Sequence, residues 1–182
     1  MRERTICWKT CVFVLAFAFV CSMAFLADRP ALAQPKVVKV GNILPLSGPS
    51  ASVGQQNRYA QDMAIEEINA AGGIKSLGGA KITMLYSDSE SKPEKGVAEA
   101  ERLINTEKVH VLTGCWNSAV TYPTTAVAER YGTPFIVPVS VADKITEQGF
   151  KTVFRIAAKD SWWTRDQFAF ISDLQKEFNA KL

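Results

Sequence analysis

Histidine and cysteine are scarce in this chain of 182 residues, which contains one histidine, His110, and four cysteines. Three of the cysteines lie within residues 1–33, so only Cys115 remains if that segment is removed. A single thiol forms no disulfide within the chain, and one cysteine with one histidine supplies too few ligands for a zinc site. No second histidine is left for a catalytic triad. We expect Cys115 to be an inert, buried thiol rather than a nucleophile.

Nucleotide-binding motifs and clustered basic residues are absent as well. No G-x-G-x-x-G follows the first predicted strand and no G-x-x-x-x-G-K occurs, so neither nucleotide fingerprint is present. The 21 basic and 18 acidic residues give a formal net charge of +3 and include no run of lysine or arginine. Binding to a phosphate backbone needs a clustered basic face, so no nucleic-acid partner is predicted. We also expect no cofactor and no metal.

The first 33 residues show the order of regions that is typical of a secretory signal peptide. A basic start precedes a nearly continuous apolar run over residues 11–27, and the small-residue sequence A-L-A follows. This order predicts cleavage between Ala33 and Gln34 and export to the periplasm of a Gram-negative cell. An uncleaved membrane anchor is the alternative, because the apolar run is close to the shortest that spans a bilayer. Cleavage is favoured because the A-L-A site follows the run at once.

Segments with strand character alternate with segments of helical periodicity in the rest of the chain. Residues 36–46 are rich in β-branched side chains, whereas apolar residues recur at spacings of three and four within 54–71. Such alternation implies right-handed crossovers, so the predicted fold is α/β, a doubly wound parallel sheet with helices on both faces. We predict strands at 36–46, 81–86, 109–113, 134–137 and 152–156, helices at 54–71, 91–106, 118–131 and from Ser161, and a short helical turn opened by a capping box at 140–143.

Ligands bind beyond the carboxyl ends of the strands in folds of this class. The rule points to the loops at 45–54, 87–92, 114–118 and 138–142. In the third loop, Asn117 and Ser118 stand at a predicted helix N-terminus, where free N–H groups and the positive end of the helix dipole suit a carboxylate.

Most of the candidate side chains have a structural alternative. Ser118 either binds a ligand or caps its own helix, and Ser140 either binds a ligand or caps the next turn. Trp116 is either a lid over an apolar ligand or a packing residue at an interface. Ser47 begins a loop of small residues that permits close approach of the backbone to a ligand.

Two sequence signatures stand in order near the start of the predicted domain, L-P-L-S-G at 44–48 and A-I-E-E-I-N-A-A-G-G-I at 64–74. Together with Gly114 and Ser118, they resemble the periplasmic leucine/isoleucine/valine-binding proteins, the type I substrate-binding components of ABC importers. The resemblance runs almost unbroken from residue 37 to about residue 156.

The resemblance implies a clamp of two lobes, each a doubly wound sheet, with the ligand between them. Ser118 matches the family serine that holds the α-carboxylate of the ligand. Val139 and Val141 match the two residues that bind its ammonium and backbone end, although the threonine hydroxyl usual at the second position is absent. Val53 stands where many members carry an aromatic residue. The sequence G-C-W at 114–116 resembles the amide- and urea-binding branches, and related proteins take aromatic acids, so the predicted ligand is an amino acid, an amide or an aromatic acid.

By this resemblance the chain divides into a signal peptide at 1–33, an incomplete N-terminal lobe of a periplasmic binding protein at 34–156, and the crossover with the first helix of a missing second lobe at 157–182. The predicted function is that of an exported solute-binding component of an ABC importer, here truncated, that serves a membrane permease. The alternative is a ligand-binding sensory domain of a receptor. An enzyme is disfavoured, because Asp88 and Glu90 fit a solvated loop better than a pair of catalytic carboxylates.

Overall fold

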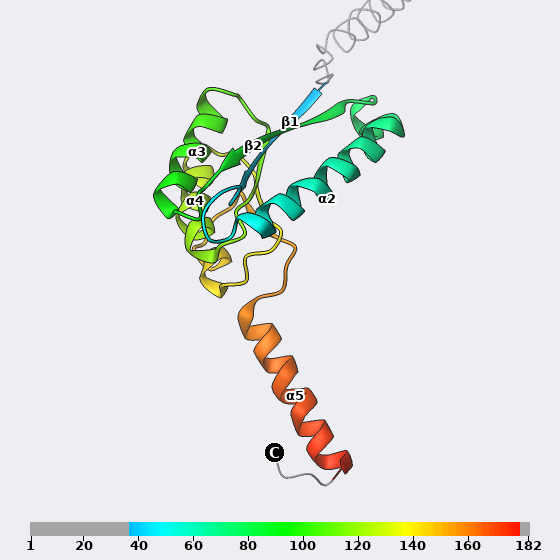
Figure 1. Cartoon of the computed structure of the whole chain (residues 1–182), viewed down its shortest axis with the longest axis vertical. Coiled ribbons are helices and arrows are strands. Elements are labelled where there is room, and N and C mark those ends of the chain that lie inside the picture. The colour runs from blue at the N-terminus through cyan, green and yellow to red at the C-terminus, as the bar shows by residue number, and fades with distance from the viewer. Residues whose placement is uncertain (1–36, 179–182) are drawn as a thin grey trace, which may run out of the picture. The chain divides into compact units, whose positions relative to one another are not determined.

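The computed structural model describes residues 37–178, which contain a five-stranded sheet with helices on both faces (Figure 1). The predicted signal peptide and its cleavage site, Ala33 and Gln34, lie outside the described residues. All neighbouring strands pair in parallel in the order β2-β1-β3-β4-β5, which confirms the predicted α/β fold with a doubly wound parallel sheet. The strands are β1 (Val37–Leu44), β2 (Lys81–Asp88), β3 (Val111–Gly114), β4 (Phe135–Val137) and β5 (Val153–Arg155).

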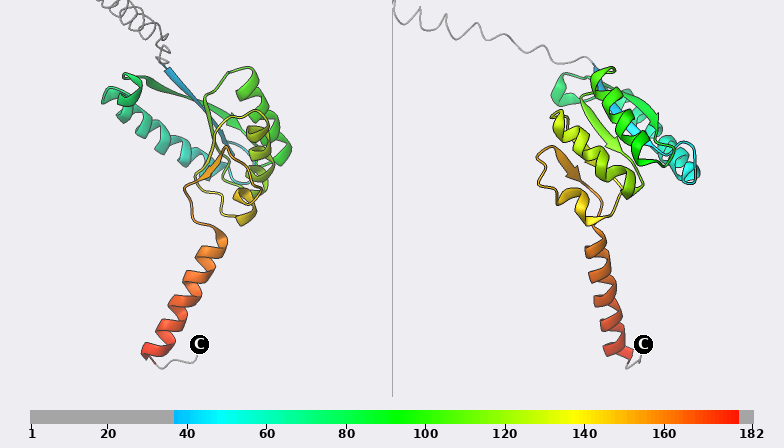
Figure 2. Two further views of the ribbon diagram at one scale, coloured as in Figure 1. Left: turned by 180° about the vertical axis from the view of Figure 1, so that it is seen from behind. Right: turned by 90° about the vertical axis from the view of Figure 1, so that its left-hand side faces the viewer.

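The helices form a layer on each face of this sheet (Figure 2). One layer is α2 (Ala51–Ala70), which contacts β1 and β2, and the other consists of α3 (Pro93–Asn105) and α4 (Ser118–Arg130), which pack on each other. Two short 3-10 turns, η1 (Lys75–Leu77) and η2 (Asp143–Thr146), follow α2 and β4.

The core lies between the sheet and the layer of α3 and α4. Strand side chains alternate between the two faces, so every second residue of β3 and β4 points into this layer. The two helices approach closely at Gly96, where a Cβ atom would lie 2.4 Å from Val120 Cγ1. The fully buried apolar side chains include Ile43, Leu103, Leu112, Val120, Phe135 and Val137.

Several predicted boundaries differ from the structure by two or three residues, and two of these differences have a clear physical reason. Helix α2 begins at Ala51 rather than at residue 54. Gly54 lies inside the first turn of the helix. A glycine is required there because this turn packs closely on the preceding loop, and a Cβ atom would be 2.0 Å from the Pro45 carbonyl oxygen. The short turn predicted at 140–143 begins later, at Asp143, because the Ser140 hydroxyl contacts Thr121 of α4 and the Trp116 carbonyl instead of capping a turn.

The last helix, α5 (Asp160–Phe178), covers neither face of the sheet, and none of its described residues is buried (Figure 2). Its aromatic side chains are largely exposed, with 57% of Trp163 and 63% of Phe170 accessible to solvent. Among residues 37–178, no helix is both long enough and apolar enough to cross a membrane.

Candidate ligand-binding site

Three of the predicted loops lie side by side at the carboxyl edge of the sheet and are joined by hydrogen bonds. The side-chain amide of Asn117 donates to the Ser50 hydroxyl at 3.2 Å, which joins the loop after β3 to the loop after β1. The Ser140 hydroxyl donates to the Trp116 carbonyl at 2.9 Å, which joins the loop after β4 to the loop after β3. The parallel order of β1, β3 and β4 brings these segments together, because their carboxyl ends share one edge.

The N-terminus of α4 opens onto this edge. Its N-cap is Asn117, with φ −71° and ψ 123°, and no side chain caps the helix. The Ser118 hydroxyl accepts a hydrogen bond from the Ala142 N–H at 3.3 Å, so the structure differs from the alternative in which Ser118 caps its own helix. The first N–H groups of an α-helix have no acceptor within the helix and lie at the positive end of its dipole. The edge therefore offers N–H donors beside a half-buried hydroxyl.

Ser140 does not cap the turn that follows it, which begins only at Asp143. Only 2% of its surface is exposed, and its Oγ lies 2.5 Å from Thr121 Oγ1 in addition to its bond with the Trp116 carbonyl. Thr121 also accepts the Cys115 N–H at 3.1 Å. Ser140 and Thr121 therefore hold the loops after β3 and β4 together from inside the protein. Thr121 was missed by the sequence reasoning, and its position one helical turn after Ser118 was the available signal.

Ser47 binds the carboxylate at the end of β2. Its hydroxyl donates to Asp88 Oδ2 at 2.5 Å, and Asp88 Oδ1 accepts the N–H groups of Leu46 at 2.8 Å, Ser47 at 3.1 Å and Glu90 at 2.8 Å. Burial by itself would raise the pKa of Asp88, but these four hydrogen bonds hold it below its usual value. The Ser47 hydroxyl is thus engaged in fixing the loops after β1 and β2.

The apolar candidates Val53, Trp116, Val139 and Val141 are all half-buried. Trp116 adopts a φ of 75°, in the left-handed region that non-glycine residues rarely occupy. Among residues 37–178, the Val139 carbonyl and the Val141 N–H have no hydrogen-bond partner. The loop after β4 therefore presents main-chain polar groups between two valine side chains.

Cys115 lies fully buried in the core, as predicted from the sequence. Burial raises the pKa of its thiol to about 12, although hydrogen bonds with Thr124 and Thr121 act in the opposite direction. A thiol with such a pKa is protonated at neutral pH and is a poor nucleophile.

The two loops nearest the N-terminus of α4 carry no carboxylate of their own. Neither 114–118 nor 138–142 contains an acidic residue. Glu90 is paired with Lys92 at 2.8 Å and with Lys95 at 3.3 Å. Within the described part of the chain, no group of three or more metal-ligating side chains is found. This arrangement is suited to holding a small anion by hydrogen bonds.

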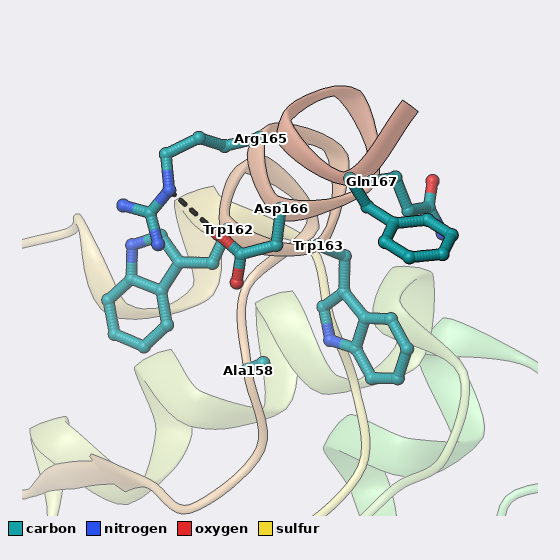
Figure 3. A pocket seen from close by; sticks show the side chains of 7 residues that line it. Ala158, Trp162, Trp163, Arg165, Asp166 and Gln167 are labelled. Carbon is teal, nitrogen blue, oxygen red and sulfur yellow. Dashed lines mark hydrogen bonds and ion pairs between the residues drawn. The ribbon is translucent and has the colours of Figure 1, made fainter. Parts of the chain in front are cut away.

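Two hollows lie beside the start of α5, and the second also touches Ala142 at the end of the loop after β4. The first has a volume of about 520 Å³ and is lined by Ala158 and by side chains of α5, including Trp162 and Trp163 (Figure 3). Two more of its lining residues, Arg165 and Asp166, form an ion pair at 2.9 Å (Figure 3). The second has a volume of about 750 Å³ and lies between η2 and α5. The first hollow is lined almost entirely by exposed side chains of one helix, and the second largely by exposed charged and polar side chains of η2 and α5, so the strand edge is the stronger candidate for a specific site.

The sequence and the fold are similar to those of known binding proteins. The profile of the family described as "Periplasmic binding protein" matches residues 37–177. "Leu/Ile/Val-binding protein homolog 7" of Brucella abortus is 34% identical over 146 residues, which are 80% of this chain and 35% of that protein.

Solved structures show the same likeness. The substrate-binding protein LivJ of Streptococcus pneumoniae, in complex with isoleucine, is 30% identical with a TM-score of 0.64, over 69% of this chain and 35% of that chain. A solute-binding protein of an ABC transporter from Rhodopseudomonas palustris, in complex with 3,4-dihydroxybenzoic acid, is 26% identical with a TM-score of 0.61, over 68% of this chain and 32% of that chain. The chain thus spans about a third of the length of the relatives that it matches.

Proposed function

The chain belongs to the periplasmic binding protein family, and from this membership we propose that the carboxyl edge of its sheet is one side of a noncovalent binding site for a small carboxylate or amide. Residues 34–156 form the N-terminal lobe in this proposal. Residues 157–182 form the crossover and the first helix of the second lobe, and the ligand lies between the lobes.

The observation that carries the proposal is the geometry around the N-terminus of α4. The Ser118 hydroxyl retains its own proton while accepting the Ala142 N–H, so it can donate to a ligand oxygen. The first N–H groups of α4 stand beside it, and no acidic residue lies in the same loop. A carboxylate placed there gains several charge-assisted hydrogen bonds at the positive end of a helix dipole.

The loop after β4 supplies the second part of the proposed site. The Val139 carbonyl would accept an N–H of an amine or amide ligand, and the Val141 N–H would donate to a carboxylate or amide oxygen. Val53, Trp116 and Val141 would contact the apolar body of the ligand. In this proposal Ser140 and Ser47 are positioning residues, because their hydroxyls already bind other loops.

The proposed ligand is a branched-chain amino acid or a related small carboxylate or amide. The complexes of LivJ with isoleucine and of the Rhodopseudomonas palustris protein with 3,4-dihydroxybenzoic acid support amino acids and aromatic acids as the classes to test. We further propose that the chain is exported by cleavage between Ala33 and Gln34, acts in the periplasm, and serves an ABC permease in the membrane.

Binding can be tested by titrating the purified, ¹⁵N-labelled protein with isoleucine, a small amide and 3,4-dihydroxybenzoate. Amide chemical shifts report weak and strong binding alike, and they also locate the site. The expected result is saturable shifts at 116–119 and 139–142. Saturable shifts confined to the aromatic face of α5 would refute this placement, and no saturable shift with any of the three compounds would refute the proposed ligand class.

Ser118→Ala should weaken the binding of a carboxylate ligand by about 1 to 3 kcal/mol, because one hydrogen bond to a charged group is lost. Ser76→Ala is the matched control, since Ser76 is an exposed serine in η1, far along the sheet from the proposed site. An unchanged affinity in Ser118→Ala would mean that the hydroxyl serves only to hold Ala142.

A further inference from the structure

Arg155, the last residue of β5, is joined by its whole guanidinium group to the segment that follows β4. Its Nη1 donates to the Ser140 carbonyl at 2.5 Å, its Nη2 to the Ala142 carbonyl at 2.7 Å, and its Nε to Thr146 Oγ1 at 3.3 Å. A planar guanidinium presents these donors in a rigid fork, so three acceptors at fixed positions define the path of the loop.

The Val141 carbonyl, between the Ser140 and Ala142 carbonyls, is also bound by the segment that follows Arg155. Val141 O accepts the Asp160 N–H at 3.0 Å, and Asp143 Oδ1 accepts the Ser161 N–H at 3.1 Å. Three consecutive carbonyls of the loop, at 140–142, are therefore bound by residues of 155–160. The neighbouring Val139 carbonyl and Val141 N–H are left without a partner among the described residues.

All acceptors of Arg155 are neutral oxygens. No carboxylate lies within ion-pair distance of it in the described part of the chain, and Asp143, Glu147 and Asp160 act on it only at longer range. Burial lowers the pKa of Arg155 and these carboxylates raise it, but a guanidinium remains charged at any ordinary pH. Partial burial of a guanidinium without a close counter-ion costs desolvation free energy that no ion pair offsets. This indicates that Arg155 is needed for the positions of its hydrogen-bond donors rather than for an ion pair.

We propose that Arg155 is a positioning residue for the ligand site, which fixes the loop at 138–142 so that its unpartnered main-chain groups face the ligand. This inference rests on the proposed function of that edge. The sequence reasoning saw this residue only as part of a short strand, and an arginine at the end of a short apolar strand was the available signal.

Arg155→Met tests the proposal, with Arg102→Met as the matched control. Arg102 also donates to three acceptors, Glu99, Glu107 and Ser87, but its side chain is exposed and it contacts neither 114–118 nor 138–142. Both variants lose a fork of three hydrogen bonds, so a general effect of lost stability should appear in both. Arg155→Lys keeps the charge and removes the fork, which separates position from charge.

Ligand affinity is measured by the same amide-shift titration, with isoleucine and 3,4-dihydroxybenzoate as probes. We expect Arg155→Met and Arg155→Lys to weaken binding by at least about fivefold, and Arg102→Met to stay within about twofold of the natural protein. Equal affinities of the natural protein and the Arg155 variants would overturn the proposal. So would an equal loss in Arg102→Met, or full rescue by lysine.

Amide hydrogen exchange supplies a readout that does not depend on ligand. The N–H groups of Ala142 and Asp160 should exchange at least about tenfold faster in Arg155→Met, with unchanged exchange in the core of β1 and β3. Unchanged exchange at these two amides would overturn the positioning role. If the natural protein binds neither probe, the proposed function fails by that result alone, and the exchange rates still decide whether Arg155 holds the loop. Arg155→Lys serves the same measurement if the methionine variant does not fold.

Discussion

The Thr121 hydroxyl is the buried junction of the loops after β3 and β4, and its removal should be costly. Thr121 is fully buried, accepts the Cys115 N–H at 3.1 Å, and has its Oγ1 at 2.5 Å from Ser140 Oγ. Thr121→Val replaces the hydroxyl by a methyl group of nearly the same size. The packing is therefore preserved while these two hydrogen bonds are lost, together with the one that Thr121 Oγ1 donates to the Asn117 carbonyl at 3.0 Å. The Asn117 carbonyl keeps the Val120 and Thr121 N–H groups, so this third loss adds little to the cost.

The expected cost follows from what each partner retains. The Cys115 N–H lies in the core and has no other acceptor among residues 37–178, so leaving it unpaired costs about 1 to 3 kcal/mol. Ser140 keeps its bond to the Trp116 carbonyl, so its loss is that of one neutral hydrogen bond, about 0.5 to 1.5 kcal/mol. The sum predicts that the free energy of unfolding falls by about 1.5 to 4.5 kcal/mol.

Thr124→Val is the matched control for this measurement. Thr124 lies on the same helix, is equally buried, and donates to the Val120 carbonyl at 2.7 Å, an oxygen that keeps its helical N–H partner. Its substitution should cost about 1 kcal/mol or less. Equilibrium unfolding in urea, followed by circular dichroism, gives both values. Equal costs for the two variants would refute the idea that the buried junction, rather than burial of any threonine, stabilises the two loops.

Three further outcomes are expected. Hydrogen bonds hold the pKa of Asp88 in the folded protein below its unfolded value of 3.8, so its contribution to stability is complete above pH 3.8 and is lost as the pH falls through the folded pKa. Asp88→Asn should therefore reduce the loss of stability that the protein shows in this acid range. Cys115 should resist alkylation by iodoacetamide at pH 8 in the folded protein and react in urea, since burial raises its pKa to about 12; rapid reaction without urea would contradict its burial. Gly96→Ala should lower the free energy of unfolding by about 1 to 3 kcal/mol, because the new Cβ would lie 2.4 Å from Val120 Cγ1; an unchanged urea midpoint would show that α3 and α4 separate freely.

The helices and strands could be predicted from the sequence because each has a local sequence pattern. Apolar residues every three or four positions mark α3, and the β-branched run at 36–46 marks β1, which spans Val37–Leu44. The exception at Gly54 has a tertiary cause, since a glycine is needed there by the close contact with Pro45 and does not mark the start of the helix. Propensity cannot distinguish these two uses of glycine.

The candidate site was predictable in place and only partly in detail. The rule of strand ends located the loops that carry Ser118 and Val139 without any knowledge of contacts. The partners of Ser140 could not be derived in this way, because Thr121 and Trp116 lie 19 and 24 positions away in the sequence. Helix capping is a local sequence pattern. The Ser140 hydroxyl instead binds Thr121 and Trp116, which come within reach only when the chain is folded.

The polar side chains of the edge and its main chain have separate tasks. The hydroxyl of Ser140, the carboxylate of Asp88 and the guanidinium of Arg155 all bind other parts of the protein. The groups left for a ligand are mainly main-chain ones, at the N-terminus of α4 and at Val139. In the proposed site, most contacts with the ligand carboxylate therefore come from main-chain groups, which no side-chain substitution removes. Substitution of the half-buried valines would then change which apolar part of a ligand the site prefers, while recognition of the carboxylate stays intact.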